Sequence, residues 1–159
     1  MNSIRIIDQH LLDDLSKQAA ASRRLRKNLN FHESDEDACH RLLNAMEPGT
    51  YIQPHHHAAE GKDETVTILR GKLGLIEFDD SGRVTGTVRL EPGGENVAVH
   101  IPRGTIHAWV ALEPGSIFIE AKAGPYRPFT PEERAAWAPA EGDPGATDYM
   151  NTLVELFNK

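Results

Sequence analysis

Histidine and acidic residues gather in one short stretch of the chain, YIQPHHHAAEGKDETVTILRG, at positions 51–71. It contains His55, His56 and His57, followed by Glu64 at the start of a run rich in β-branched residues. A further histidine, His107, comes directly after a Pro/Gly turn in PRGTIHAWV. Imidazole and carboxylate groups suit divalent first-row transition metals. These residue types therefore indicate metal chemistry, provided that the fold brings them together.

Strand geometry decides which of these side chains can share one centre. Side chains on a strand alternate between two faces, so His55 and His57 point to one side and His56 to the other. The run that begins at Glu64 can return antiparallel beside them and supply a carboxylate. His107, early in a later strand, offers a third imidazole.

The chain resembles the cupins in two motifs. Their first motif is Gly, five residues, His-x-His, a short gap, Glu, six residues and Gly; it is matched here by Gly49, His55, His57, Glu64 and Gly71. Their second motif, Pro-x-Gly-x-x-His, is matched by PRGTIH at 102–107. The resemblance implies an all-β cupin jelly-roll barrel (a double-stranded β-helix). It also implies one divalent metal ion (Fe, Mn, Ni, Zn or Co) inside the barrel, with His55, His57, Glu64 and His107 as its ligands.

The chain departs from the cupin pattern in three places. Six residues rather than three or four separate His57 from Glu64, Asn96 stands where the second motif opens with Gly, and Ala111 stands where it ends with Asn. A narrower resemblance, to the WbuC family of cupin metalloproteins, is carried by RKNLNFH, RLLNAMEPGTYIQPHHH, GPY at 124–126 and WAPAEG at 137–142. It implies an association with O-antigen and surface-polysaccharide gene clusters and leaves the reaction undefined.

The pattern of apolar residues predicts the elements around this site. A helix is expected from the N-cap Asp8 to about Ser22. Eight or nine short strands separated by Gly/Pro turns are expected between 40 and 123, and an amphipathic helix in ATDYMNTLVELFN. We expect an N-terminal helix and basic loop at 1–39, the barrel at 40–124, and a C-terminal extension at 125–159 whose helix packs on the barrel.

Further candidates follow from which face a side chain occupies. Tyr51 and Gln53 are expected on the same strand face as His55, and they either line the cavity or fill the barrel. Trp109 is expected on the same strand face as His107, where it either forms a pocket wall or packs in the core. Glu120 and Lys122 alternate on the last strand; they meet in the pocket as a catalytic acid/base pair or form an exposed edge pair of little energetic weight.

One basic cluster, RRLRK at 23–27, precedes the expected barrel. It is either a solvated surface run or an anion clamp that folds over the cavity mouth, because guanidinium groups match phosphate and carboxylate. The residues assigned to substrate binding in the second case are Arg26, Lys27, Asn30 and His32, with Asn28 beside them.

Composition limits the class of protein. The chain has 17 basic and 24 acidic residues, so its formal net charge is 17 − 24 = −7. A negative net charge disfavours nucleic-acid partners. No run approaches the roughly 20 apolar residues of a membrane span, and no secretory signal is visible. A single cysteine, Cys39, fits the cytoplasm. The expected partners are a small sugar-like ligand and a second copy of the chain, paired through an edge strand.

Three functions are compatible with these features. The first is a metal-dependent enzyme with isomerase- or epimerase-like chemistry on a sugar or nucleotide-sugar of surface-polysaccharide biosynthesis. The second is an iron-dependent oxygenase, and the third is a non-catalytic metal- or sugar-binding module. A metal-free epimerase is disfavoured, because such an enzyme would not need all four metal ligands and the chain has the full set.

Overall fold

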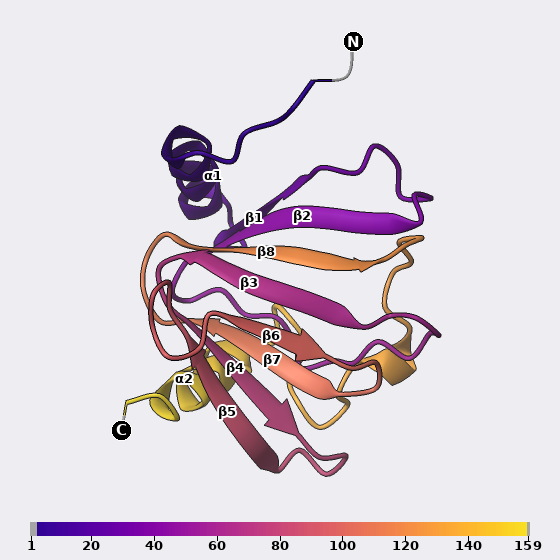
Figure 1. Ribbon diagram of the computed structural model, residues 1–159. Helices are drawn as coiled ribbons and strands as arrows, with labels where there is room; N and C mark the ends of the chain where they lie inside the picture. The colour runs from indigo at the N-terminus through magenta and orange to yellow at the C-terminus, as the bar shows by residue number, and fades with distance from the viewer. Residues whose placement is uncertain (1–2, 159) are drawn as a thin grey trace.

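Two antiparallel sheets face each other in the computed structural model, which describes residues 3–158, and a helix lies outside each sheet (Figure 1). The elements are α1 (Gln9–Ala21), β1 (Arg26–Asn30), β2 (Cys39–Met46), β3 (Glu64–Arg70), β4 (Leu73–Phe78), β5 (Val84–Leu90), β6 (Ala98–Ile101), β7 (Ile106–Ala111), β8 (Ser116–Ala123), the 3-10 helix η1 (Pro131–Glu133) and α2 (Ala146–Glu155). The strand orders are β1-β2-β8-β3-β6 and β5-β4-β7. The predicted all-β architecture with a helix at each end is confirmed, although the two sheets remain separate and do not close into a barrel.

Helix α1 covers the outer face of the five-stranded sheet. Its N-cap is Asp8, as predicted, and the Asp8 carboxylate accepts a hydrogen bond from the backbone N–H of Leu11. Leu12 and Leu15 are buried against the outward-facing Leu43 of β2. This cover explains why β2 and β8 carry apolar side chains on their outer faces as well as on part of their inner faces.

Helix α2 packs on the outer face of the three-stranded sheet, against β4 and β7. Its buried side chains include Met150 and Leu153, and Phe157 follows just after the helix. Gly74 of β4 leaves room for the Phe157 ring, because a Cβ there would overlap it. The predicted docking of the C-terminal helix on a sheet is thus observed, and no helix within residues 3–158 has the length and hydropathy of a membrane span.

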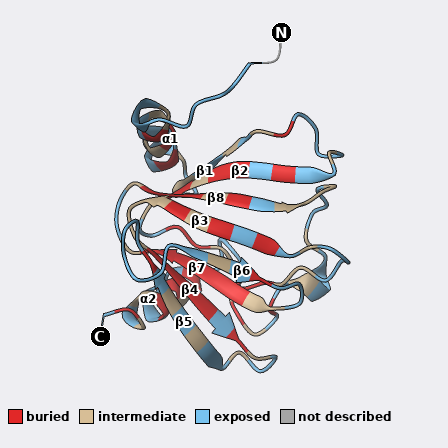
Figure 2. Ribbon diagram, in the orientation of Figure 1, coloured by how far each residue is buried: buried red, intermediate tan, exposed pale blue. Residues whose placement is uncertain are grey.

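The space between the sheets is divided into an apolar half and a polar half. Buried apolar side chains fill the first half; they are Met46, Val66, Ile68, Leu73, Leu75, Leu90, Ile101, Trp109, Ala111 and Phe118. Figure 2 colours the buried residues of these strands red. At the other half, the register aligns His40 of β2 with Lys122 of β8 and Lys122 with Glu64 of β3. On β3 and β8, the polar inward residues Glu64, Glu120 and Lys122 thus lie together at this end of the sheet.

Two segments differ from the expected local structure. Residues 26–30, expected in a basic loop, form the edge strand β1, since they pair with β2 in a regular antiparallel register. Residues 51–57, expected as a strand, are extended but make only isolated bridges, between His55 and His107 and between His55 and Arg134. Pro54 has no backbone N–H to continue a ladder.

Gly71 makes the tight turn between β3 and β4, at a φ of +73°. A Cβ at this position would overlap the Ser116 Oγ and lie 2.7 Å from the Ser116 Cα. We expect Gly71→Ala to lower the free energy of unfolding by about 2–5 kcal/mol, the sum of backbone strain and steric overlap. Urea denaturation of the variant and the wild type measures this loss in the free energy of unfolding.

Gly93→Ala is the matched control for this prediction. Gly93 has nearly the same φ, +72°, and a Cβ added there would meet no atom within 4 Å. Its substitution should therefore cost only the backbone term, about 1–2 kcal/mol. Equal losses in the two variants would show that the contact with Ser116 has no energetic weight.

Candidate metal centre

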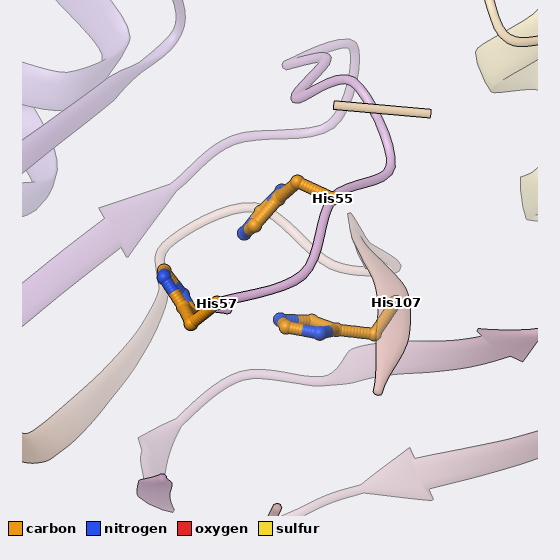
Figure 3. A group of neighbouring side chains, drawn as sticks. All are labelled: His55, His57 and His107. Carbon is orange, nitrogen blue, oxygen red and sulfur yellow. The ribbon is translucent and has the colours of Figure 1, made fainter. Parts of the chain in front are cut away.

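Three imidazoles converge on one point between the sheets (Figure 3). His55 and His57 come from the extended segment before β3, and His107 comes from β7; one potential ligand atom of each lies within 4.8 Å of the others. Two backbone hydrogen bonds hold the segments together, from His55 N–H to the His107 carbonyl (3.1 Å) and from His107 N–H to the His55 carbonyl (2.9 Å). The bridge thus fixes two of the three side chains against each other.

Backbone carbonyls orient two of these rings. The Nδ1 of His55 lies 2.9 Å from the Gln53 carbonyl, and the Nδ1 of His107 lies 2.9 Å from the Thr105 carbonyl. A carbonyl only accepts, so each Nδ1 carries the proton and each Nε2 presents a lone pair to the centre. Such a hydrogen bond on the far nitrogen is typical of metal-binding histidines.

Glu64 at the start of β3 points into the same centre and is only 5% exposed. One of its oxygens lies 3.0 Å from the His57 Nε2 and the other 3.3 Å from the His107 Nε2. Both Nε2 atoms are buried without a hydrogen bond of acceptable geometry. For His107 this places a nitrogen lone pair against a carboxylate oxygen, an arrangement that a cation between them relieves. Three nitrogens and a carboxylate therefore fit a divalent metal ion.

The protonation states also suit a cation. The Lys122 ammonium, 3.4 Å from a Glu64 oxygen, favours the carboxylate form of Glu64. Burial, reinforced by the neighbouring His107, lowers the pKa of His55 to about 3. Carboxylate and neutral imidazole, the forms that bind metals, are therefore present at neutral pH.

The histidine cluster lies in a cavity of about 400 Å³, within the range of small-molecule sites. Glu120 and Lys122, the predicted acid/base pair, both line it. The Lys122 Nζ lies 2.8 Å from a Glu120 oxygen and 3.4 Å from a Glu64 oxygen, and the Asn44 amide donates to Glu120 at 3.0 Å. Burial raises the pKa of Glu120 to about 7, which Lys122 opposes and Glu64 reinforces. A proton-exchanging group thus stands beside the cluster.

The remaining predicted pocket residues divide into two groups. Those that line the cavity are Arg26, Asn28, Asn30, His32 and Trp109. Lys27 does not line it, because strand alternation turns it to the opposite face from Arg26 and Asn28.

Tyr51 and Gln53 do not line the cavity either, which corrects the parity prediction. The Tyr51 hydroxyl donates to the Pro139 carbonyl, and the Gln53 amide donates to the carbonyls of Ala135 and Ala138. Ile52 faces the cavity in their place. The alternation breaks at Pro54, where the segment leaves regular strand geometry, so both polar side chains anchor the C-terminal extension.

Two members of the basic cluster, Arg24 and Arg26, are already paired in the folded chain. Glu141 receives two contacts from Arg24, at 2.8 and 2.9 Å, and one from Arg26, at 2.7 Å. Arg26 also donates to the Thr50 hydroxyl and the Tyr51 carbonyl. These guanidinium groups tie β1 to the C-terminal extension, so an anion clamp, one of the two alternatives for this cluster, would have to displace Glu141 from Arg24 and Arg26.

This pairing predicts an acid-sensitive contribution to stability. Hydrogen bonds from Arg24, together with those from Arg26, outweigh burial and lower the pKa of Glu141 from 4.5 to about 2. Since the folded value is the lower one, ionised Glu141 stabilises the fold above about pH 4.5, and this contribution is lost as the pH falls towards 2. Glu141→Gln should flatten the pH dependence of the unfolding free energy in this window. Glu60→Gln, at an exposed position without an ion pair in the described chain, is the control; the same change there would refute the pairing.

Phe129 is a site residue that the sequence did not reveal. Its ring lies 4.4 Å from that of His55 and 5.2 Å from that of His57, measured between centroids. It belongs to the Pro-rich extension after β8, which the Glu133 carboxylate fastens to the Ala58 N–H. Such a tail has no periodic pattern, and no feature of the sequence indicated that it returns to cover the histidines.

Comparison with known proteins identifies a family and a fold. The family described as Domain of unknown function (DUF6016) matches residues 7–90. None of the curated proteins compared with the chain matches it.

Several solved structures are similar to the chain. KdgF from Halomonas sp. has 22% identity and a TM-score of 0.50, covering 64% of this chain and 82% of its own. A conserved protein of unknown function from Streptococcus pyogenes, SPY1581, has 15% identity and a TM-score of 0.52, covering 80% and 93%. A recombinant oxalate oxidase in complex with glycolate has 12% identity and a TM-score of 0.51, covering 67% and 55%. At these identities the likeness shows the fold alone, which is the cupin fold that the two motifs predicted.

Proposed function

The chain belongs to the DUF6016 family, and we propose that it is a metal-dependent cupin that acts on a small hydroxylated ligand in the cavity beside Glu120. The observation that carries the metal assignment is the pair of buried Nε2 atoms, of His57 and His107, that face the Glu64 carboxylate without a hydrogen bond. The proposed ligands are His55, His57, Glu64 and His107.

Groups beside the proposed ligands support a reaction rather than metal storage. A bound divalent ion would supply a Lewis acid that polarises a ligand oxygen. Glu120 lines the same cavity and is positioned to take a proton from, or return it to, a ligand carbon. Lys122 and Asn44 hold its two oxygens, at 2.8 and 3.0 Å, and so fix its direction. This arrangement suits isomerisation or epimerisation next to a carbonyl group.

The identity of the ligand class is also part of the proposal. The narrower resemblance, to WbuC cupins, favours a sugar or nucleotide-sugar of O-antigen or surface-polysaccharide biosynthesis, handled in the cytoplasm by a homodimer. The polar and apolar walls of the cavity support a hydroxylated ring. Sedimentation at micromolar concentration tests the dimer, and a purely monomeric protein would refute that part.

Solvent deuterium incorporation tests the reaction. The protein, loaded in turn with Fe, Mn, Ni, Zn or Co, is incubated in D₂O with nucleotide-sugars and free ketoses and aldoses, and the products are followed by NMR. Deuterium should appear at the carbon next to the carbonyl, and Glu120→Gln should slow its appearance by about 100-fold or more. Absence of exchange with every metal and sugar would contradict an isomerase. Ligand binding without exchange would assign the chain to the binding modules.

A further inference from the structure

We propose that the cavity has a second subsite, formed by Asn28, Asn30 and Asn44, that binds a neutral hydroxyl-rich group of the ligand at a distance from the histidine cluster. The inference rests on the proposed function, because it takes this cavity to be the ligand site. It adds that the ligand is at least two sugar units long. It also adds that the remote unit is a neutral sugar and not a diphosphate.

The register places the three asparagines together. Asn28 of β1 pairs with Asn44 of β2, and Asn30 lies two residues further along β1, on the same inward face. All three line the 400 Å³ cavity. Asn28 and Asn30 are exposed at the open mouth of the cavity, and Asn44 is half-buried behind them. The mouth therefore presents three amides that a ligand can reach from solvent.

Each amide keeps one end available. The Asn28 amide donates to the Asn30 carbonyl oxygen at 2.8 Å, and the Asn44 amide donates to Glu120. Within the described residues, the Asn28 and Asn44 carbonyl oxygens and the Asn30 NH₂ group have no further side-chain partner. Two acceptors and a donor side by side match adjacent hydroxyl groups, which both donate and accept.

The part of the subsite on β1, Asn28 and Asn30, is separated from the proposed metal ligands by the width of several strands, whereas Asn44 lies between the two regions. Glu64 lies on β3, and the sheet order places β8 and β2 between β3 and β1. Three strand spacings amount to about 14 Å. A ligand that touches both Glu64 and Asn30 must therefore be longer than a single sugar ring. The apolar faces of its rings can pack on Ile52 and Trp109, which also line the cavity.

Charge argues for a neutral group at this end. The three side chains are uncharged amides, and the nearby Arg24 and Arg26 already share Glu141. A diphosphate placed here would have to compete with that carboxylate for the guanidinium groups. A sugar unit needs no such exchange.

Saturation-transfer NMR with maltose, lactose and cellobiose tests the proposal, with UDP as the charged probe. At least one disaccharide should bind the metal-free protein, and Glu64→Gln should bind it as well, because the subsite does not use the metal. The double variant Asn28→Ala/Asn30→Ala should bind it at least about tenfold more weakly. Asn151→Ala, at an exposed position on α2, is the control and should leave binding unchanged.

The outcomes separate this proposal from the metal assignment. Disaccharide binding by a wild-type protein that shows no affinity for any divalent metal in a separate titration would sustain the subsite and refute the metal assignment. No signal with any of the three disaccharides, or equal binding by the double variant and the wild type, would overturn the subsite. Binding of UDP that is lost in Arg24→Ala would overturn the assignment of a neutral remote group.

Discussion

Replacing His107 with alanine is expected to weaken the affinity for divalent metal ions by more than about 100-fold, since even groups that only support a ligand contribute 10–100-fold. The His107 ring is 2% exposed, and its Nε2 faces the Glu64 carboxylate at 3.3 Å. Isothermal titration with Zn²⁺ or Co²⁺ into the chelator-treated protein gives the affinity, and circular dichroism reports whether the variant folds.

Two further variants make this result specific. Glu64→Gln keeps the shape of the side chain and removes its charge, so it should lose affinity without leaving a void. His56→Ala removes the middle histidine of the same run, whose side chain lies outside the three-histidine cluster, and should bind metal as the wild type does. Equal losses at His56 and His107 would mean that the titrated metal binds elsewhere.

The second large effect is expected at Lys122, whose ammonium lies between two buried carboxylates. Glu64 and Glu120 are 5% and 7% exposed, and Lys122→Met leaves both without their lysine. Removing one partner of a buried ion pair costs about 3–5 kcal/mol. We expect this loss in the unfolding free energy of the metal-free protein at pH 7, measured by urea denaturation.

Lys72 offers a matched comparison. Its side chain is as exposed as that of Lys122 (24% against 23%), and it also contacts two glutamates, Glu91 and Glu113. Those partners are about half exposed, so Lys72→Met should cost no more than about 1 kcal/mol. If Lys122→Met lost no more stability than Lys72→Met, the buried carboxylates at the cavity would not depend on Lys122.

The architecture of the fold and the convergence of the four proposed metal ligands could both be predicted from the sequence, for different reasons. The strands were visible because Gly/Pro turns separate short apolar runs, and α1 because Asp8 caps a periodic pattern. The convergence of His55, His57, Glu64 and His107 was expected from motif spacing. The strand assumed for His55 and His57 does not exist, yet both side chains reach the centre because the segment remains extended beside β7.

What could not be predicted depends on contacts between distant parts of the chain. Tyr51 and Gln53 were misplaced because Pro54 interrupts the alternation, an effect that parity alone ignores. Glu141 neutralises Arg26 across 115 positions, and nothing near either residue indicates the other. Phe129 lies beside the histidines because contacts such as that of Glu133 with Ala58 hold the C-terminal extension in place.

Anomalous X-ray scattering on crystals of protein purified without added metal is the sharpest test of the metal centre. We expect one anomalous peak between the sheets, in contact with the Nε2 atoms of His55, His57 and His107 and with the Glu64 carboxylate. A peak bound at other residues, or a Glu64 carboxylate turned away from the metal, would refute the four-ligand centre.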